Sequence, residues 1–447
     1  MSDPLDLERL KAIAGDLVAD ALRHGADAAD AVIARGDALS AEVRDGKIEE
    51  TERAEGDDLA LRVFVGRRSA SVSTNTFGRL AGLAERAVAM AHVAPEDRFA
   101  GLADPASLAR RFAELDLVDH ADPTAESLGE AALALEAAAV AVPGVTRSGG
   151  ASASWSRSGL VLATSDGFLG GYVRSSHGRS ATAIAGEGTG MERDWWAAAA
   201  IHLGDLPDLA EIGRKAGERA VRRLAPRKVE TCVTTVVFDP RVATSLVGHL
   251  AGAANGAAIA RGTSFLKERL GARVFAPGIT IVDDPTRRRG LASRPFDGEG
   301  IAGAPLDLVA DGVLTTWLLD SAAARELGLE TNGRASRGAG APSPGSTNLT
   351  LLPGAMPPAD LIAQIGTGLY VTDLIGHGAN LITGDYSRGA SGFWIENGTL
   401  AYPVAELTIA GHLAEMFARL VPANDLEYRF AVNAPTVAIE GLTVAGR

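Results

Sequence analysis

The sequence predicts an α+β protein, built from antiparallel, hairpin-rich sheets with packed helices and divided into two main domains. Helical spacing and period-two alternation occupy separate blocks, and the strands are not followed regularly by crossover helices. Asp-Gly and Asn-Gly pairs separate alternating runs, as in β-hairpins. The length of 447 residues exceeds what one hydrophobic core usually holds. We therefore expect domains at 1–225 and 226–447, with 100–120 as a candidate division within the first.

The first elements are helical and then strand-forming. Residues 5–35 have helical spacing, and from residue 39 the period changes to two. Asp45-Gly46 and the polar cluster at 55–58 lie between alternating runs, so we expect a meander of about four strands. A second helical pattern over 77–94 follows the meander.

The rest of the first half repeats this arrangement. A helix near 124–142 precedes a second antiparallel set, in which Asp166-Gly167 marks the turn. Residues 207–225 return to a helix with a basic C-terminal end. The following segment, 225–231, is the expected domain boundary.

The second half is dominated by strands around a few helices. The run "CVTTVVF" predicts a buried strand, and Asp239-Pro240 then supplies an N-cap and a proline at the first helical position. Hairpins are expected at Asp311-Gly312 and Asn397-Gly398. The segment from Gly333 to Gly345 lacks the lysine and the strand-to-helix context of a phosphate loop, so we interpret it as a flexible surface loop.

Composition excludes several classes of function. With 43 basic and 56 acidic residues the formal charge is −13, so no nucleic-acid partner is expected. Cys232 is the single cysteine, which excludes internal disulfides and multi-thiolate zinc sites and fits a reducing compartment. The start of the chain lacks the features of a signal peptide, and Glu136 and Pro143 interrupt the most apolar stretch. We expect a cytoplasmic protein without a membrane partner.

Residue chemistry by itself shows no complete active site. None of the eight histidines precedes a glutamate, so the zincin motif is absent, and no serine lies in a convincing nucleophile elbow. Asp283 and Asp284 end an apolar run before a proline, where carboxylates commonly cap a turn rather than catalyse. We interpret Cys232 as a small core residue and the run 287–289, three arginines, as a solvated turn rather than an anion site.

The helix that begins at Asp239 is rich in small side chains, which permit close backbone approach. We expect tight packing there, against the sheet of the same chain or against a partner. The small residues are Gly248, Ala251, Gly252, Ala253, Ala254, Gly256, Ala257 and Ala258.

From about residue 30 to 446 the chain resembles the TldD/PmbA family, a two-subunit bacterial peptidase system whose members were long labelled modulators of DNA gyrase. The most specific stretch is "GLYVTDLIGHGANLITGDYSRGASGFWIENGTLAYPV"; weaker ones include "RDGKIEE", "DRFAGLAD", "TSDGFLGGY", "ARGTSFL" and "PANDLEYRF". In the TldD type of subunit, the matching helix resembles His-Glu-x-x-x-His, and a cysteine near the C-terminus is a further metal ligand. In this sequence that pattern falls on Thr244, Ser245 and His249, and the C-terminal segment contains no cysteine.

The resemblance therefore implies a TldE/PmbA-type subunit that binds no cofactor and has no catalytic residues of its own. Zinc is expected in a TldD-type partner, and extended, unfolded peptides are the expected substrates. Two alternatives stay open. One is a self-sufficient hydrolase that uses carboxylates such as Asp283, Asp284 and Asp385; the other is a stand-alone homodimeric binding protein.

Overall fold

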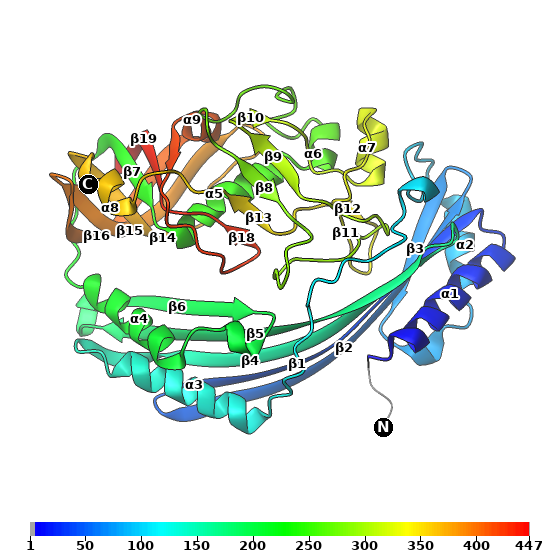
Figure 1. Cartoon of the computed structure of the whole chain (residues 1–447), viewed down its shortest axis with the longest axis horizontal. Helices are drawn as coiled ribbons and strands as arrows, with labels where there is room; N and C mark the ends of the chain where they lie inside the picture. Colours follow the sequence, from blue (N-terminus) through cyan, green and yellow to red (C-terminus); the bar gives the residue numbers. More distant parts are fainter. Residues whose placement is uncertain (1–4, 447) are drawn as a thin grey trace.

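The computed structural model describes residues 5–446, and its N-terminal half is one long, curved antiparallel sheet (Figure 1). The strand order is β3-β2-β1-β4-β5-β6, and every neighbouring pair is antiparallel. The strands are β1 (Ala28–Arg44), β2 (Lys47–Val65), β3 (Arg68–Thr74), β4 (Val145–Thr164), β5 (Leu169–Ala185) and β6 (Glu192–Ala200). Asp45-Gly46 and Asp166-Gly167 form the predicted turns.

Two predictions for this half were wrong. The first helix, α1 (Leu7–Arg23), ends well before residue 35, and β1 begins at Ala28. The polar cluster 55–58 forms no turn, because β2 runs through it and the meander has three strands. Charges there are accommodated by cross-strand pairing on the ladder: Arg35 Nε lies 3.1 Å from Asp57 Oδ1.

Four helices cover one face of this sheet. Alternate side chains of a strand point to opposite faces, so Ile33 packs with α1 and α2 while its neighbour Val32 packs with Phe296 of the second half. Toward the other end of the strands, α3 and α4 cover the same face as α1 and α2. The helices are α2 (Leu83–Val93), α3 (Ala125–Val140) and α4 (Leu209–Arg222), with short 3-10 turns η1 (Phe77–Arg79), η2 (Pro105–Ser107), η3 (Gly188–Gly190) and η4 (Leu203–Asp205).

The second half contains a small closed barrel. The order β16-β15-β14-β7-β19 closes because β16 also pairs with β19, from Thr408 opposite Ala445 to Ala410 opposite Thr443. Asn397-Gly398 forms the predicted hairpin turn, with positive φ at both residues. The strands are β7 (Cys232–Phe238), β14 (Thr367–Ile375), β15 (Asp385–Glu396), β16 (Thr399–His412) and β19 (Val437–Ala445), and β17 (Leu420–Pro422) extends from β19.

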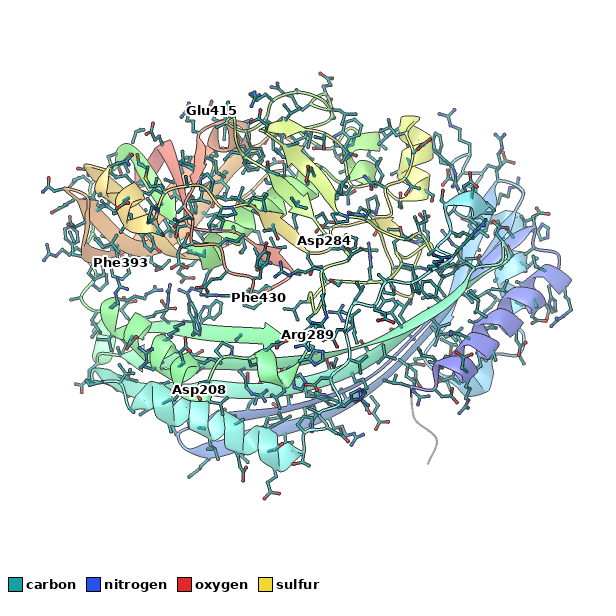
Figure 2. All side chains as sticks on the ribbon, in the orientation of Figure 1. Asp208, Asp284, Arg289, Phe393, Glu415 and Phe430 are labelled. Atoms are coloured by element: carbon teal, nitrogen blue, oxygen red, sulfur yellow. The ribbon has the colours of Figure 1, made fainter. Side chains whose placement is uncertain are left out.

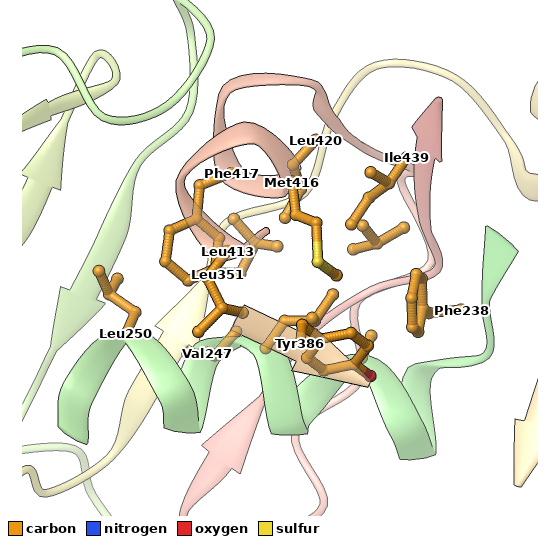
Figure 3. Packing of buried hydrophobic residues seen from close by; sticks show 14 of the residues in the cluster. Phe238, Val247, Leu250, Leu351, Tyr386, Leu413, Met416, Phe417, Leu420 and Ile439 are labelled. Carbon is orange, nitrogen blue, oxygen red and sulfur yellow. The ribbon is translucent and has the colours of Figure 1, made fainter. Parts of the chain in front are cut away.

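A second sheet and one helix complete the core of this half. Figure 3 shows Val247 and Leu250 of α5 (Pro240–Ala253) facing Leu351, Tyr386 and Phe417. The sheet has the order β10-β9-β8-β13-β18: β10 (Val313–Leu314), β9 (Leu306–Ala310), β8 (Ile281–Asp283), β13 (Leu349–Leu351) and β18 (Val432–Asn433). A two-stranded ribbon joins β11 (Ala335–Ser336) and β12 (Ser343–Pro344), and the short helices are α6 (Gly256–Ala260), α7 (Ser321–Leu327), α8 (Pro358–Ala363) and α9 (Leu413–Ala418).

These elements confirm the α+β fold class. We refer to residues 5–224 as the N-terminal lobe and to residues 232–446 as the C-terminal lobe; the latter lies over the concave side of the long sheet (Figure 1). Within 5–446, no helix is long and apolar enough to cross a membrane.

Two arginine-containing segments are less exposed than the sequence suggested. The segment Gly333–Gly345 is not a flexible surface loop at its base, because it contains β11 and β12 and because Arg334 is fully buried. The run 287–289 does not form a free, solvated turn: Arg289 bonds Asp116 at 2.6 Å and Asp205 at 3.0 Å, both in the N-terminal lobe. Acidic partners that are distant in sequence explain both departures: Arg334 pairs with Asp283 of its own lobe, and Arg289 pairs with Asp116 and Asp205 of the N-terminal lobe.

The glycines around α5 have unequal surroundings, which allows a matched test. A Cβ at Gly248 meets open space, whereas one at Gly256 meets Leu319 Cδ2 at 2.6 Å and Leu318 O at 2.8 Å. We expect Gly248→Ala to raise the free energy of unfolding by about 0.5–1 kcal/mol, through helix propensity. We expect Gly256→Ala to lower it by about 1–3 kcal/mol, through overpacking. Urea unfolding of both variants measures the difference, and equal shifts would show that this packing is wrong.

Candidate functional site

The helix α5 carries the three positions that the family pattern singles out, and its start is well defined. Asp239 accepts a hydrogen bond from the Arg241 backbone N–H at 3.0 Å, and Pro240 occupies the first helical position. The preceding strand β7 and the neighbouring strand β14 fix where this helix begins. Thr244, Ser245 and His249 thus lie on a rigid, core-packed element.

The hydroxyl groups of Thr244 and Ser245 are committed to the helix backbone. Thr244 Oγ1 donates to the carbonyl of Arg241 at 2.9 Å, and Ser245 Oγ donates to the carbonyl of Val242 at 2.7 Å. Bonds of this kind to the preceding turn are common for hydroxyl side chains in helices. Neither residue supplies the imidazole or carboxylate that zinc chemistry uses at these positions.

His249 is half-buried and its ring Nε2 has no hydrogen-bond partner in the described chain. The ring contacts Tyr386 edge to face, with centroids 6.0 Å apart. Burial lowers the pKa of His249, and the guanidinium of Arg388 lowers it further. A positive charge beside a single imidazole disfavours a second cation, so these residues do not fit a zinc ion.

The wider arrangement agrees with this. Nowhere between residues 5 and 446 do three or more His, Cys, Asp or Glu side chains gather in a way that could hold a metal ion. Cys232 lies partly buried on β7, where burial raises the pKa of its thiol, which makes the thiolate less available.

The lowered pKa of His249 makes a pH-dependent prediction. The folded state resists protonation of this ring, while the unfolded state takes up the proton near pH 6.5. The contribution of His249 to the free energy of unfolding is therefore fully present above that pH and is lost as the pH falls below it. We expect His249→Phe to lose less stability than the wild type between pH 7.5 and 5.5. Urea unfolding at the two pH values measures this. His177, whose pKa burial also lowers, is present in both proteins and cancels. An identical acid loss in both proteins would contradict the assignment.

The three carboxylates of the alternative hydrolase hypothesis have different environments. Asp283 is fully buried and paired with Arg334. Asp284 accepts from the backbone N–H and the hydroxyl of Thr286 at 2.8 and 2.7 Å, so it caps the turn as expected. Asp385 accepts from the Thr383 hydroxyl at 2.6 Å on the exposed start of β15.

Two neighbouring cavities share Arg429 and Phe430 as lining residues; the larger has walls from both lobes, and the smaller is lined by the C-terminal lobe alone. The smaller, about 100 Å³, is lined by Arg241 and Thr244 of α5 and by the segment 425–434. The larger, about 220 Å³, is lined by residues 287–291 and by Ala199 and Ala200 at the end of β6. Together they form what we call the interlobe groove; Figure 2 shows Phe430 and Arg289 between the lobes.

The strand that borders this groove is the edge of the long sheet. Within residues 5–446, β6 forms a ladder with β5 alone, so its outer edge has no strand partner. Its last four residues, 197–200, are all alanine. An edge of this kind can pair with the backbone of an extended peptide and leaves room for varied side chains.

The interlobe groove was missed by sequence reasoning. Its residues come from segments around 199, 241, 288 and 429, and nothing local in the sequence connects them. One signal was available: residues 422–430 are the stretch "PANDLEYRF", which carries part of the family resemblance without an assigned role.

The chain matches known proteins over almost its whole length. Three family models match in order: PmbA/TldA metallopeptidase domain 1 (29–91), the central domain (119–224) and the C-terminal domain (231–446). The metalloprotease PmbA of Escherichia coli O157:H7 is 35% identical over 425 residues, covering 94% of this chain and 93% of its own length. A PmbA homologue from Haemophilus influenzae is 33% identical, covering 95% and 94%.

Solved structures share the whole fold. A protein from Bacteroides thetaiotaomicron, described as a candidate modulator of DNA gyrase, superposes with a TM-score of 0.90 at 28% identity, covering 98% of this chain and 99% of its own. TldE from Thermococcus kodakarensis has a TM-score of 0.87 at 18% identity, covering 97% and 100%. With relatives of this identity and coverage, and with all three family models in order, the chain belongs to the PmbA/TldD family of metallopeptidases.

Proposed function

We propose that this chain is a metal-free, non-catalytic subunit of a heteromeric metallopeptidase whose TldD-type partner holds the zinc. The side chains at the three motif positions of α5 carry the proposal. The hydroxyl groups of Thr244 and Ser245 are bonded to the backbone of the helix itself, and the imidazole of His249 lies beside a guanidinium group. A metal's affinity and the acidity of its bound water depend on the ligands that are missing here.

In this proposal the chain holds the substrate rather than cutting it. The outer edge of β6 pairs with the backbone of an unfolded peptide in the interlobe groove, which needs no particular sequence because the bonds are main-chain bonds. The alanine run 197–200 keeps the groove wide for side chains of different size. Small, loosely structured peptides and proteins are the substrates that suit this geometry.

Reconstitution tests the proposal. The chain and a TldD-type subunit are purified separately, and hydrolysis of an unfolded peptide is measured for each alone and for the mixture. We expect activity that needs both chains and is lost on chelation of zinc. Chelator-resistant hydrolysis by this chain alone would contradict it and favour the self-sufficient hydrolase.

A variant separates substrate holding from assembly. Ala199 lines the groove, so Ala199→Trp fills it, whereas Ala54→Trp introduces the same side chain at an exposed position of β2. We expect the first variant to raise the KM of the reconstituted enzyme at least roughly tenfold, equivalent to about 1.4 kcal/mol of peptide binding, and the second to leave it unchanged. Complex formation, measured by gel filtration, is expected to be normal for both.

A further inference from the structure

The larger cavity of the interlobe groove is rich in arginine. Among the described residues that line it there are four guanidinium groups but a single carboxylate, that of Asp205. Asp205 is already engaged, because both of its oxygens lie 3.0 Å from Arg289 Nη1. This local excess of positive charge contrasts with the whole chain, whose formal charge is −13. The four arginines are Arg287, Arg288, Arg289 and Arg429.

The acidic side chains around the turn 287–289 do not balance its charge. Arg288 Nη2 and Arg289 Nε both lie 2.6 Å from the same oxygen, Oδ2 of Asp116. In the part of the chain that the structure describes, the three arginines of this turn thus have two carboxylates within ion-pair distance, Asp116 and Asp205. The turn therefore keeps an excess of positive charge.

Arg287 is the arginine that supplies this excess. Within residues 5–446 its guanidinium makes no ion pair and donates no hydrogen bond; its contact is with the ring of Tyr428, whose centroid lies 3.2 Å from Cζ. At this distance the planar group stacks face to face on the ring, so the N–H groups at its edge remain available to an acceptor. Tyr428 is 50% exposed, which places the stack at the surface of the groove.

The backbone holds the turn independently of the Arg287 side chain. The carbonyl of Arg287 accepts from the backbone N–H of Gly290 at 3.0 Å and from the hydroxyl of Ser293 at 2.5 Å. Both bonds remain when the side chain is changed. The position of residue 287 is therefore fixed before a ligand arrives, and substitutions there test charge rather than folding.

We propose that the interlobe groove selects acidic peptides and that Arg287 pairs with an acidic side chain of the bound peptide. This rests on the function proposed above, in which an extended peptide pairs with the outer edge of β6. Ala199 and Ala200 of β6 line the same cavity as the arginines, so a peptide on this edge passes beside them. A guanidinium group binds a carboxylate through two parallel hydrogen bonds.

The placement of the arginines favours side-chain carboxylates over the C-terminus of a peptide. A single terminal carboxylate reaches one guanidinium fork, whereas the arginines of the groove come from two separate segments, the turn 287–289 and the loop that carries Arg429. Alternate residues of an extended peptide point to the same side, so several acidic side chains can face these segments at once.

Peptide binding to the purified full chain tests the selection. Three unfolded peptides differ only at alternate positions, which carry Glu, Gln or Lys, and both ends are capped so that no terminal carboxylate is present. Dissociation constants are measured by fluorescence anisotropy. We expect the Glu peptide to bind at least about fivefold more tightly than the Gln peptide, and the Lys peptide to bind most weakly.

Each contrary result has its own meaning. Equal binding of the Glu and Gln peptides overturns the acidic preference and leaves the holding of peptides intact. Tightest binding of the Lys peptide overturns it as well, because the overall charge of −13 then decides. A Gln peptide with a free C-terminus that binds as tightly as the Glu peptide overturns the assignment to side chains. Binding of none of the peptides overturns both the selection and the holding role, whereas hydrolysis by this chain alone contradicts the metal-free role without changing the ratio.

Variants locate the preference at Arg287. Arg287→Gln removes the charge, Arg287→Lys restores it, and Arg86→Gln makes the first change at an exposed position of α2. We expect Arg287→Gln to reduce the ratio of Glu-peptide to Gln-peptide affinity at least about twofold, and the other two variants to keep it. Melting temperatures equal to that of the wild type confirm that the variants are folded. An undiminished ratio in Arg287→Gln overturns the role of this residue.

Discussion

Arg334→Met is expected to lower the free energy of unfolding by about 3–5 kcal/mol, because it leaves the buried carboxylate of Asp283 without its counter-charge. Both side chains are fully buried, and Arg334 Nε bonds Asp283 directly. The guanidinium also donates to the carbonyls of Asp283, Ala304 and Asn332 at 3.0, 2.6 and 2.8 Å. Several loops therefore lose their common anchor. Urea unfolding followed by circular dichroism measures the loss.

The control removes both charges. In Arg334→Met with Asp283→Asn no unpaired charge stays buried, and we expect the double variant to recover part of the lost stability. Single and double losses that simply add would contradict direct coupling. The same pair bears on function, because an Asp283 committed to Arg334 and to the Thr347 hydroxyl at 2.9 Å is held as a structural group.

Arg241→Ala is expected to cost about 3 kcal/mol and to loosen the docking of the lobes. Arg241 Nη1 bonds Asp194 of β6 at 2.9 Å and the carbonyl of Trp195 at 2.7 Å, and Nη2 lies 3.2 Å from the carbonyl of Thr372 on β14. Its side chain is 6% exposed. We place the effect at the low end of the range for buried pairs because Asp194 keeps other cations nearby: the side chains of Arg219 and Arg223 lie 3.7 Å from it.

Two measurements check this expectation. Urea unfolding gives the stability, and the rate of tryptic cleavage within 225–231 reports how far the lobes separate. Arg241→Lys keeps a charge and is expected to lose less on both. A lower free energy of unfolding without faster cleavage at the junction would show that Arg241 stabilises α5 alone rather than the contact between the lobes.

The sequence predicted those parts of the fold that depend on neighbouring residues. Asp45-Gly46, Asp166-Gly167 and Asn397-Gly398 form turns because they tolerate positive φ, and Asp239-Pro240 starts a helix because it caps one. The cluster 55–58 was mistaken for a turn because polar composition suggests a loop, whereas here the charges pair across an exposed ladder.

The same reasoning could not find the interlobe contacts. Arg337 pairs with Asp30, 307 residues away, and Arg289 pairs with Asp116, 173 residues away. No local sequence pattern predicts such pairs. For the candidate site, the family resemblance placed Thr244, Ser245 and His249 on one helix, as found. It did not place Arg388 or Tyr386 beside His249, because they come from β15.

The zinc content of the chain purified alone, measured by elemental mass spectrometry without chelators, tests the account most directly. We expect close to zero zinc per chain, because α5 offers a single imidazole next to the guanidinium of Arg388 and two hydroxyl groups already bonded to the backbone. Close to one zinc per chain, retained after dialysis and lost in His249→Phe, would contradict the account and would favour the self-sufficient hydrolase.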